Sequence, residues 1–440
     1  MAPQCGIDIA NCPCFDPGAP MCGGCCKRCG GCPAWRHCTI QPNDRDNRNG
    51  QEQLRVAMQL KNFDIDGFLR DYWQKKPLLI RNPWNSWHNP LDPDELAGLA
   101  CEEGVESRLI MQARNTWKAE NGPFPESRFG TLRNKPWTLL VQAVDHYVPD
   151  VAALIAPFRF IPNWRIDDVM VSYATDEGGV GPHFDQYDVF LIQGLGKRRW
   201  QVVAPCDSAS ALLPHDDLRL LASFDSHDEW ILEPGDILYI PPRIAHNGIA
   251  VGDGCMTYSI GFRAPSRSEL IGHWCDDLLA GMQDDDRFVD PNLRQQDNPG
   301  EISNGALAAL HAMIITKIGD HDAFARWFGQ YSSTPRYPDM DWQPEEPIEI
   351  EQLRARLATG VPLCRNPASR FSFVRQGAGS VLLFVDGQCF ECARETTALA
   401  EYLCAQDQFT LDPGLIHSHA AMALVAKLFN NGALNFCHEI

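Results

Sequence analysis

Short apolar segments separated by glycine, proline and aspartate fill the middle of the chain, from about residue 165 to 263. Six of them are rich in Val, Ile, Tyr, Phe and Trp: VMVSYA, YDVFLIQG, RRWQVVAP, EWILEPG, DILYIPP and MTYSIGFRA. Segments of this length and composition predict strands. Many short strands with turn residues between them predict a β-sandwich or a barrel. Glu233-Pro234-Gly235-Asp236 predicts a turn before a buried strand.

Helical periodicity flanks this β region on both sides. After it, Leu270, Trp274 and Leu278 recur at helical spacing, and LAALHAMIITKI and AFARWF give two more apolar faces. Helices this apolar must pack against either the barrel or a second subunit, and the second alternative would make the protein a homodimer. The predicted elements before the β region are a helix over 63–73, a strand over 78–80, a helix that begins at Asp92-Pro93, helices around 136–146 and 150–157, and a strand over 165–175.

A small unit of mixed helices and strands is expected over residues 342–440. It begins within an acidic, proline-rich linker, PRYPDMDWQPEEP. We expect in it a helix over 350–358, a strand over 369–374, a hairpin over 380–392 around Asp386-Gly387, two more helices and a short final strand. This mixture is similar to a winged helix. The unit holds seven basic and eleven acidic residues, so we do not predict DNA binding from it.

The first 57 residues differ in composition from everything after them. Nine of the 18 cysteines lie between Cys5 and Cys38, and a polar linker with little to bury follows. The segment CGGCCKRCGGC is compatible with zinc or an iron–sulfur cluster. The other interpretations are a disordered tail and a start codon assigned too far upstream. The remaining nine cysteines are scattered, which indicates mostly reduced, buried side chains.

The chain of 440 residues has 38 basic and 57 acidic side chains, which gives a formal net charge of −19. A basic footprint for nucleic acid is therefore absent, and a cationic protein partner is favoured. No apolar run approaches the roughly 18 residues of a membrane span. The N-terminus lacks the pattern of a secretory signal. We therefore expect a cytoplasmic protein that does not bind membranes.

The residues that favour a specific chemistry lie in GGVGPHFDQYDVFLIQGLGKRRWQVV and EPGDILYIPPRIAHNG. His183 and Asp185 are two positions apart, so on an extended chain both side chains point to one face and can reach one metal. His246 follows an apolar strand, and in a closed barrel a late strand can lie beside an early one. Two histidines and one carboxylate form the facial triad of non-haem Fe(II) oxygenases, although zinc could use the same ligands.

Three basic residues, Lys197, Arg198 and Arg199, follow a glycine turn. Alternate strand residues face the interior, so Arg198 points opposite to its two neighbours. A basic side chain inside a barrel needs an anionic partner, and arginine can hold a dicarboxylate cosubstrate with two hydrogen bonds. Periodicity alone does not choose which of the three faces inward, and solvated edge charges are the alternative.

In these motifs the chain resembles the JmjC-type 2-oxoglutarate oxygenases, and most closely the bacterial ribosomal oxygenase group. The matching segments are DYWQKKPLLIR, DPDELAGLA, WRIDDVMVSYA, GPHFDQYDVFLIQGLGKRRWQV, LEPGDILYIPPRIAH and YSIGFRAPSRSELI. The resemblance implies a mainly β fold with α: a double-stranded β-helix (a jelly-roll, cupin-like JmjC barrel) in residues 58–265, a helical dimerisation segment in 266–335 and a C-terminal winged-helix domain in 342–440. Residues 1–57 lie outside it.

The resemblance also implies roles for single residues. His183, Asp185 and His246 would bind Fe(II). Arg198 would hold the distal carboxylate of 2-oxoglutarate, and Ser172 would be a second cosubstrate contact. The implied substrate is an arginine of large-subunit ribosomal protein sixteen, hydroxylated on its β-carbon. Residues near the predicted mouth that could meet this cation are Tyr187, Asp188 and the Asp176–Glu177 loop.

Two other functions fit the same residues. The first is lysine demethylation on the same scaffold, which requires recognition of a methylammonium group. The second is a non-enzymatic regulatory protein built on a metal-free or zinc-filled cupin-like barrel. Product mass separates the first from hydroxylation, and metal content together with 2-oxoglutarate binding tests the second.

Overall fold

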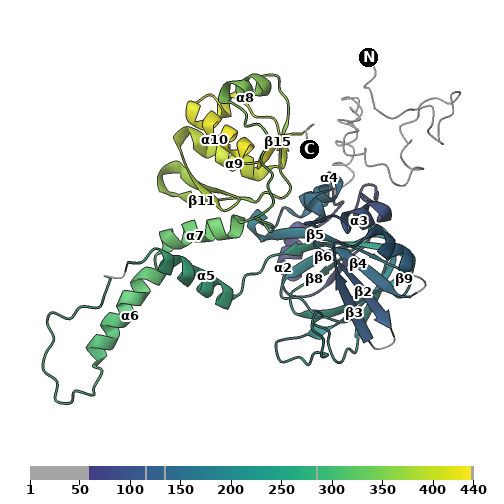
Figure 1. Ribbon diagram of the computed structural model, residues 1–440, viewed down its shortest axis with the longest axis horizontal. Coiled ribbons are helices and arrows are strands. Elements are labelled where there is room, and N and C mark those ends of the chain that lie inside the picture. Colours follow the sequence, from purple (N-terminus) through teal and green to yellow (C-terminus); the bar gives the residue numbers. More distant parts are fainter. Residues whose placement is uncertain (1–58, 114–115, 133–134, 284–285, 438–440) are drawn as a thin grey trace. The chain divides into compact units, whose positions relative to one another are not determined.

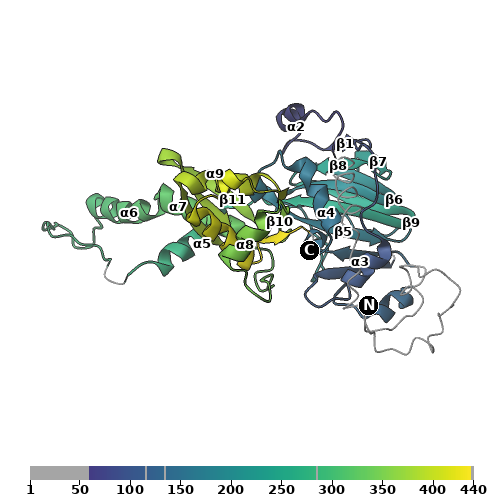
Figure 2. The ribbon, with the colours of Figure 1, turned by 90° about the horizontal axis from the view of Figure 1, so that it is seen from above.

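The largest element of the structure is a nine-stranded antiparallel sheet with the order β1-β8-β6-β9-β5-β4-β2-β3, in which β7 pairs with β6. Figure 2 shows β8, β6, β9 and β5 side by side. The structure is a computed structural model that describes residues 59–113, 116–132, 135–283 and 286–437, so the cysteine-rich motif lies outside the described residues. The strands are β1 (Leu78–Ile80), β2 (Ser107–Ala113), β3 (Thr116–Asn121), β4 (Trp137–Val141), β5 (Ile166–Ala174), β6 (Asp188–Pro205), β7 (Asp228–Leu232), β8 (Ile237–Ile240) and β9 (Ile244–Phe262).

Two long strands, β6 and β9, form the centre of this sheet. Their pairing runs from Asp188 opposite Phe262 to Pro205 opposite Ile244. The sequence predicts two strands where β6 is one, because the glycines between them suggest a turn. In the structure these glycines form an irregularity within continuous pairing. Gly196 has a φ of +60°, and a Cβ there would lie 2.8 Å from a carbonyl oxygen of β9, so glycine keeps the strands together through the bulge.

Short helices accompany the sheet, and the first two begin at caps that the sequence encodes. Phe68 of α2 (Ile65–Asp71) contacts the rings of Phe190 and Tyr239. Asp92 caps α3 (Pro93–Leu99) in a capping box with Glu95, which confirms the predicted helix start. The remaining helices of this half are α4 (Pro149–Ala152) and the 3-10 helices η4 (Glu126–Thr131), η5 (Val144–His146), η6 (Ala153–Phe158) and η7 (Asn163–Arg165).

The predicted helix around 136–146 is wrong, because its first half is strand β4. This strand pairs with β2 on one side and with β5 on the other. The sequence analysis predicted neither β2 nor β3, so the partner that makes 137–141 a strand was missing from it. Leu139 and Val141 are buried on one face of β4, and Thr138 is buried on the opposite face. Residues 137–141 therefore form a strand because they pair with distant segments, and this pairing outweighs their local helical periodicity.

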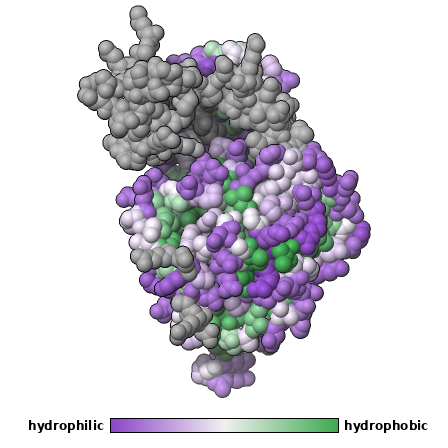
Figure 3. Space-filling view, turned by 90° about the vertical axis from the view of Figure 1, so that its right-hand side faces the viewer, coloured by the Kyte–Doolittle hydropathy of each residue, from purple (hydrophilic) through white to green (hydrophobic). Residues whose placement is uncertain are grey.

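Three helices follow the sheet, as the apolar spacing predicts: α5 (Arg267–Ala280), α6 (Asn304–Ile318) and α7 (His321–Ser333). Helix α6 meets α5 and α7 at one end and extends away from them in both ribbon views (Figures 1 and 2). Twelve of the seventeen large hydrophobic side chains exposed among the described residues lie between Ile271 and Ile318. By contrast, the side shown in Figure 3 carries its apolar surface as separate patches among polar residues. No helix in the described ranges is long and apolar enough to cross a membrane.

The C-terminal unit contains the helices and the hairpin that the sequence predicts (Figure 1). The predicted turn lies at Asp386 and Gly387, whose φ angles of 49° and 77° suit a tight hairpin. Its sheets have the orders β14-β10-β15 and β11-β12-β13. The elements are α8 (Ile350–Leu357), β10 (Leu363–Arg365), β11 (Phe371–Gln376), η8 (Gly377–Gly379), β12 (Ser380–Val385), β13 (Gln388–Ala393), η9 (Arg394–Thr396), α9 (Thr397–Ala405), β14 (Gln408–Phe409), η10 (Pro413–Leu415), α10 (His419–Asn430) and β15 (Leu434–Phe436).

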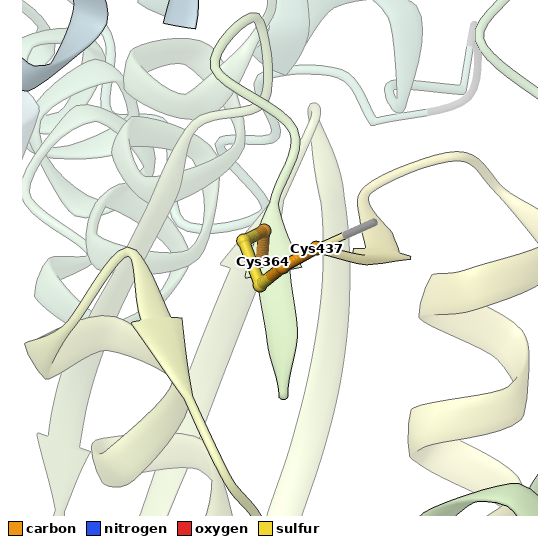
Figure 4. The surroundings of a disulfide bond; sticks show 2 residues. All are labelled: Cys364 and Cys437. Carbon is orange, nitrogen blue, oxygen red and sulfur yellow. A yellow bond between two sulfur atoms is a disulfide. The ribbon is translucent and has the colours of Figure 1, made fainter. Parts of the chain in front are cut away.

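Two of the scattered cysteines, predicted to be reduced, form a disulfide instead (Figure 4). Cys364 lies in β10, and Cys437 follows β15, the strand that pairs with β10. The two are 73 residues apart, so only the strand pairing shows that they meet. Seven other described cysteines are free, in agreement with the prediction.

Gly329 tests how closely α7 packs against the hairpin. A Cβ at this position would lie 2.2 Å from the ring of Phe384, which is fully buried in β12. We expect Gly329→Ala to lower the free energy of unfolding by about 1–3 kcal/mol, because the ring has no room to move. Gly98→Ala in α3 is the control, since a Cβ there meets nothing within 4 Å. Denaturant unfolding of both variants checks this, and equal stability would contradict the packing.

Candidate metal centre

Three side chains with metal-binding atoms converge at one end of the β6–β9 pair. Their donor atoms all lie within 4.8 Å of one another, and they belong to His183, Asp185 and His246. The Asp185 Oδ2 atom is 4.0 Å from His183 Nε2 and 3.6 Å from His246 Nε2. Two donors that share an ion at about 2.1 Å can be no more than about 4.2 Å apart. Both distances from Asp185 are within this limit, so the structure gathers the three predicted ligands around one candidate ion position.

The backbone holds the two histidines together. His183 and His246 exchange two hydrogen bonds: the His183 N–H donates to the His246 carbonyl at 3.1 Å, and the His246 N–H donates back at 2.8 Å. The Arg243 N–H donates to the Asp185 carbonyl at 2.6 Å, which ties the aspartate to the segment that leads into β9. A Cβ at Gly179 would lie 2.5 Å from the Gly248 carbonyl oxygen, so a glycine is needed for the loop to approach β9.

Both imidazole rings are oriented by backbone carbonyls. His183 Nδ1 lies 2.8 Å from the Gly181 oxygen, and His246 Nδ1 lies 3.0 Å from the Ile244 oxygen. A carbonyl only accepts hydrogen bonds, so each Nδ1 carries the hydrogen and each Nε2 keeps a free lone pair. Burial, with a smaller contribution from His183, lowers the pKa of His246 to about 4. His246 is therefore neutral at pH 7, the form that binds metals.

The donor set fits divalent iron. Two neutral imidazoles and one carboxylate on one side of an ion leave the other positions open, which is the arrangement of non-haem Fe(II) oxygenases. His246 is 2% exposed. The side chains of His183 and Asp185 are 25% and 22% exposed, so the open side faces the solvent.

Of the three basic residues after the glycine turn, Arg198 is the one that points inward. It is 3% exposed, and its Nε donates to the sulfur of Cys255 at 3.4 Å. Its Nη2 is buried and has no hydrogen-bond partner among the described residues. Lys197 is instead exposed and forms an ion pair with Glu233 at 2.6 Å. A buried guanidinium without an anion is costly, so the site fits a ligand carboxylate beside Arg198.

Polar side chains extend this interior face beyond Arg198. Thr257 lies opposite Ser172 on one side and opposite Gln193 on the other, and all three are buried. The Ser172 hydroxyl donates to the Thr257 carbonyl at 3.4 Å, and the Thr257 hydroxyl donates to Gln193 Oε1 at 3.2 Å. The sequence analysis named only Ser172. Gln193, Thr257 and Thr138 were missed, although a polar residue within an apolar strand segment such as VFLIQG or WTLLV is a usable indication.

Trp200 links the metal ligands to the arginine. Its ring centroid is 5.7 Å from that of His246, and the Arg198 guanidinium carbon is 5.8 Å from the Trp200 ring. A Cβ at Gly248 would lie 2.6 Å from this ring, so the indole fits only because that strand position is glycine. The indole therefore forms a wall along one side of the interior. The sequence analysis did not identify it.

The residues predicted to contact the substrate differ in how exposed they are. Tyr187 is 44% exposed beside the metal ligands in sequence. The Asp176–Glu177 loop is exposed but does not lie at the metal ligands, because Asp176 accepts a hydrogen bond from the Gly252 N–H at 2.6 Å, six residues along β9 from His246. The prediction for Asp188 is wrong, because its side chain is fully buried. Asp188 accepts hydrogen bonds from Tyr239 at 2.6 Å and from Gln74 at 2.9 Å. With those partners it cannot meet an incoming cation.

Comparison with known protein families finds a JmjC domain and a winged helix, the two domains that the sequence predicts. A JmjC domain model matches residues 153–270, and a ROXA-like winged-helix model matches residues 316–435. The ribosomal protein uL16 3-hydroxylase of Escherichia coli is 40% identical over 298 residues, which cover 68% of this chain and 79% of that protein.

Solved structures of the Escherichia coli ribosomal oxygenase YcfD are similar over the whole fold. The complex with cobalt and 2-oxoglutarate has a TM-score of 0.75 at 35% identity, and the complex with cobalt and succinic acid has a TM-score of 0.76 at 34% identity. Each match covers 86% of this chain and 99% of the other. The predicted mainly β fold with a C-terminal winged helix is thereby confirmed.

Gly248 tests whether Trp200 positions His246. We expect Gly248→Ala to weaken Co²⁺ binding by about 10- to 100-fold, because the new methyl displaces the indole that packs on a metal-ligand ring. Gly261→Ala on the same strand is the control, since the nearest atom to its Cβ would be 3.9 Å away. Anaerobic titration with Co²⁺, followed by absorbance, checks this. Unchanged affinity in Gly248→Ala would show that the indole does not hold the ligand.

Proposed function

This chain belongs to the JmjC-type ribosomal oxygenases, and from that premise we propose that it is an Fe(II)- and 2-oxoglutarate-dependent hydroxylase of a ribosomal protein. In this scheme residues 58–265 carry the reaction, residues 266–335 dimerise and residues 342–440 form the winged helix. The observation that carries the proposal is the pairing of a two-histidine, one-carboxylate site with a buried guanidinium that has no anionic partner among the described residues.

Each residue of the site has a separate task in the proposed reaction. When bound, the iron with 2-oxoglutarate and dioxygen supplies the oxidising chemistry that places one oxygen on a substrate carbon, with succinate and carbon dioxide as the other products. His183, Asp185 and His246 hold the ion from one side and leave the exposed side for the substrate. Arg198 and Ser172 hold the cosubstrate in the interior, where Trp200 excludes water from one side.

We propose that the substrate is an arginine of ribosomal protein uL16, hydroxylated on its β-carbon. Two observations support it: the Escherichia coli relative is named for hydroxylation of uL16, and this chain has a net charge of −19, which favours a basic partner. Ribosomal proteins are used in the cytoplasm, so we place the protein there. Of the exposed residues, Tyr187 remains available to receive the arginine side chain, because it lies two residues after the metal ligand Asp185.

We also propose that the protein is a homodimer formed through α6. Leu307, Leu310, Ile314 and Ile318 form one apolar stripe on this helix and are 39–57% exposed. No residue of α6 is buried, although the helix is largely apolar. A continuous apolar face of this kind marks a protein–protein interface, and a second copy presents the same face in return.

Removal of the single charged ligand tests the proposed reaction. We expect Asp185→Ala to abolish both Co²⁺ binding at this site and hydroxylation of uL16, because two imidazoles alone hold the ion poorly. Mass spectrometry of recombinant uL16 incubated with Fe(II), 2-oxoglutarate and dioxygen measures the gain of one oxygen. Asp216→Ala, in an exposed loop, is the control.

The same experiment separates the competing functions. Loss of a methyl group from a lysine would identify a demethylase. A wild-type protein that binds neither metal nor 2-oxoglutarate under anaerobic conditions would favour the non-enzymatic regulatory protein. Persistent hydroxylation coupled to succinate formation in Asp185→Ala would contradict the assigned ligands.

The proposed dimer is tested on α6. Ile314→Glu should convert a dimer into a monomer in sedimentation velocity, because a carboxylate would be buried in the apolar contact. Thr316→Glu is the matched control: it adds the same charge to the opposite side of the helix, about 200° away. A wild-type monomer, or an Ile314→Glu dimer, would refute this interface.

A further inference from the structure

We propose that Thr138 is a further cosubstrate-binding residue, whose hydroxyl donates a hydrogen bond to the distal carboxylate of 2-oxoglutarate beside Arg198. The inference rests on the proposed function and adds to it a residue from β4, outside the two strands that carry the metal ligand His246 and the arginine.

Thr138 is the one hydroxyl in a cross-strand row of interior residues. The strand registers align five residues across neighbouring strands, from β3 to β9, and four of them are apolar or a thiol. The row consists of Ala119, Ile110, Thr138, Ala174 and Cys255. Thr138 is fully buried, and its Oγ1 has no hydrogen-bond partner among the described residues. A buried hydroxyl without a hydrogen-bond partner is destabilising, so we expect a bound ligand to supply the acceptor at this position.

The row ends at the arginine. Cys255 accepts a hydrogen bond from Arg198 Nε at 3.4 Å, so the guanidinium lies over that end of the row. Between Cys255 and Thr138 the row holds only Ala174, whose side chain is a single methyl group. Ala174, Ala250 and Cys255 form a small buried cluster at this point. The free hydroxyl of Thr138 and the free Nη2 of Arg198 therefore border the same floor of small side chains.

The other interior hydroxyls have partners within the protein. Ser172 donates to the Thr257 carbonyl at 3.4 Å, a bond that it must exchange in order to contact the cosubstrate, and Thr257 donates to Gln193. Thr138 differs from them because its hydrogen is available. One carboxylate has two oxygens and can accept from Thr138 and from Arg198 at once, which satisfies both buried donors. A buried water could satisfy the hydroxyl but would leave the guanidinium charge without an anion.

The test is 2-oxoglutarate binding to the full chain loaded with Co²⁺ under anaerobic conditions, measured by calorimetry. Thr138→Val keeps the shape of the side chain and removes the hydroxyl, so we expect the dissociation constant to rise about tenfold or more. Thr138→Ser should restore most of the affinity. Ser372→Ala is the matched control, because it removes another buried hydroxyl without a partner, in β11 of the C-terminal unit.

A second ligand locates the contact. In 2-oxopentanoate a methyl group replaces the distal carboxylate, while the end that binds the metal is unchanged. Wild type and Thr138→Val should bind this analogue equally, because the contact has lost its partner. Equal 2-oxoglutarate affinity of both proteins, or an equal loss for both ligands in Thr138→Val, would overturn the inference. Failure of the wild type to bind 2-oxoglutarate would instead overturn the proposed function. Thermal unfolding of each variant confirms that the fold is intact.

Discussion

The two backbone hydrogen bonds between His183 and His246 are the constraint on which the rest of the site depends. They join a loop before β6 to the start of β9, across 63 residues of chain. Because side chains alternate along a strand, a slip of one residue in β9 would turn His246 away from Asp185. The long pairing of β6 with β9 prevents such a slip, and the glycines at 179 and 248 let the loop and Trp200 approach closely enough.

The same register arranges the side chains beside the metal centre. On β9, His246, Gly248 and Ala250 face the interior and lie opposite Val202, Trp200 and Arg198 of β6. The metal ligand and the guanidinium are therefore four residues apart along β9, about 13 Å between backbone positions. Their side chains shorten this gap toward the length of a five-carbon diacid. Trp200 fills one side of the gap, so a ligand in it lies against an aromatic wall and away from water.

Local sequence rules predicted the parts of this site that depend on neighbouring residues. The two-residue spacing of His183 and Asp185 placed both on one face, and strand alternation separated Arg198 from Lys197. Such local rules failed where residues far along the chain determine the structure. Thr138 was assigned to a helix because its partner strands were not recognised. Asp188 was assigned to the mouth because its hydrogen-bond partners, Gln74 and Tyr239, come from far along the chain. The Cys364–Cys437 disulfide was missed for the same reason.

The exposed fraction of the site residues increases from the interior of the barrel to its surface. Thr138, Arg198 and His246 are at most 3% exposed, whereas the side chains of His183 and Asp185 are about a quarter exposed and Tyr187 is 44% exposed. A small diacid held by the inner residues must therefore pass the metal ligands to reach them. A protein substrate can only approach from the outer side, where it would close that path. The geometry thus favours binding of the cosubstrate before the protein substrate, because the larger molecule covers the entrance that the smaller one uses.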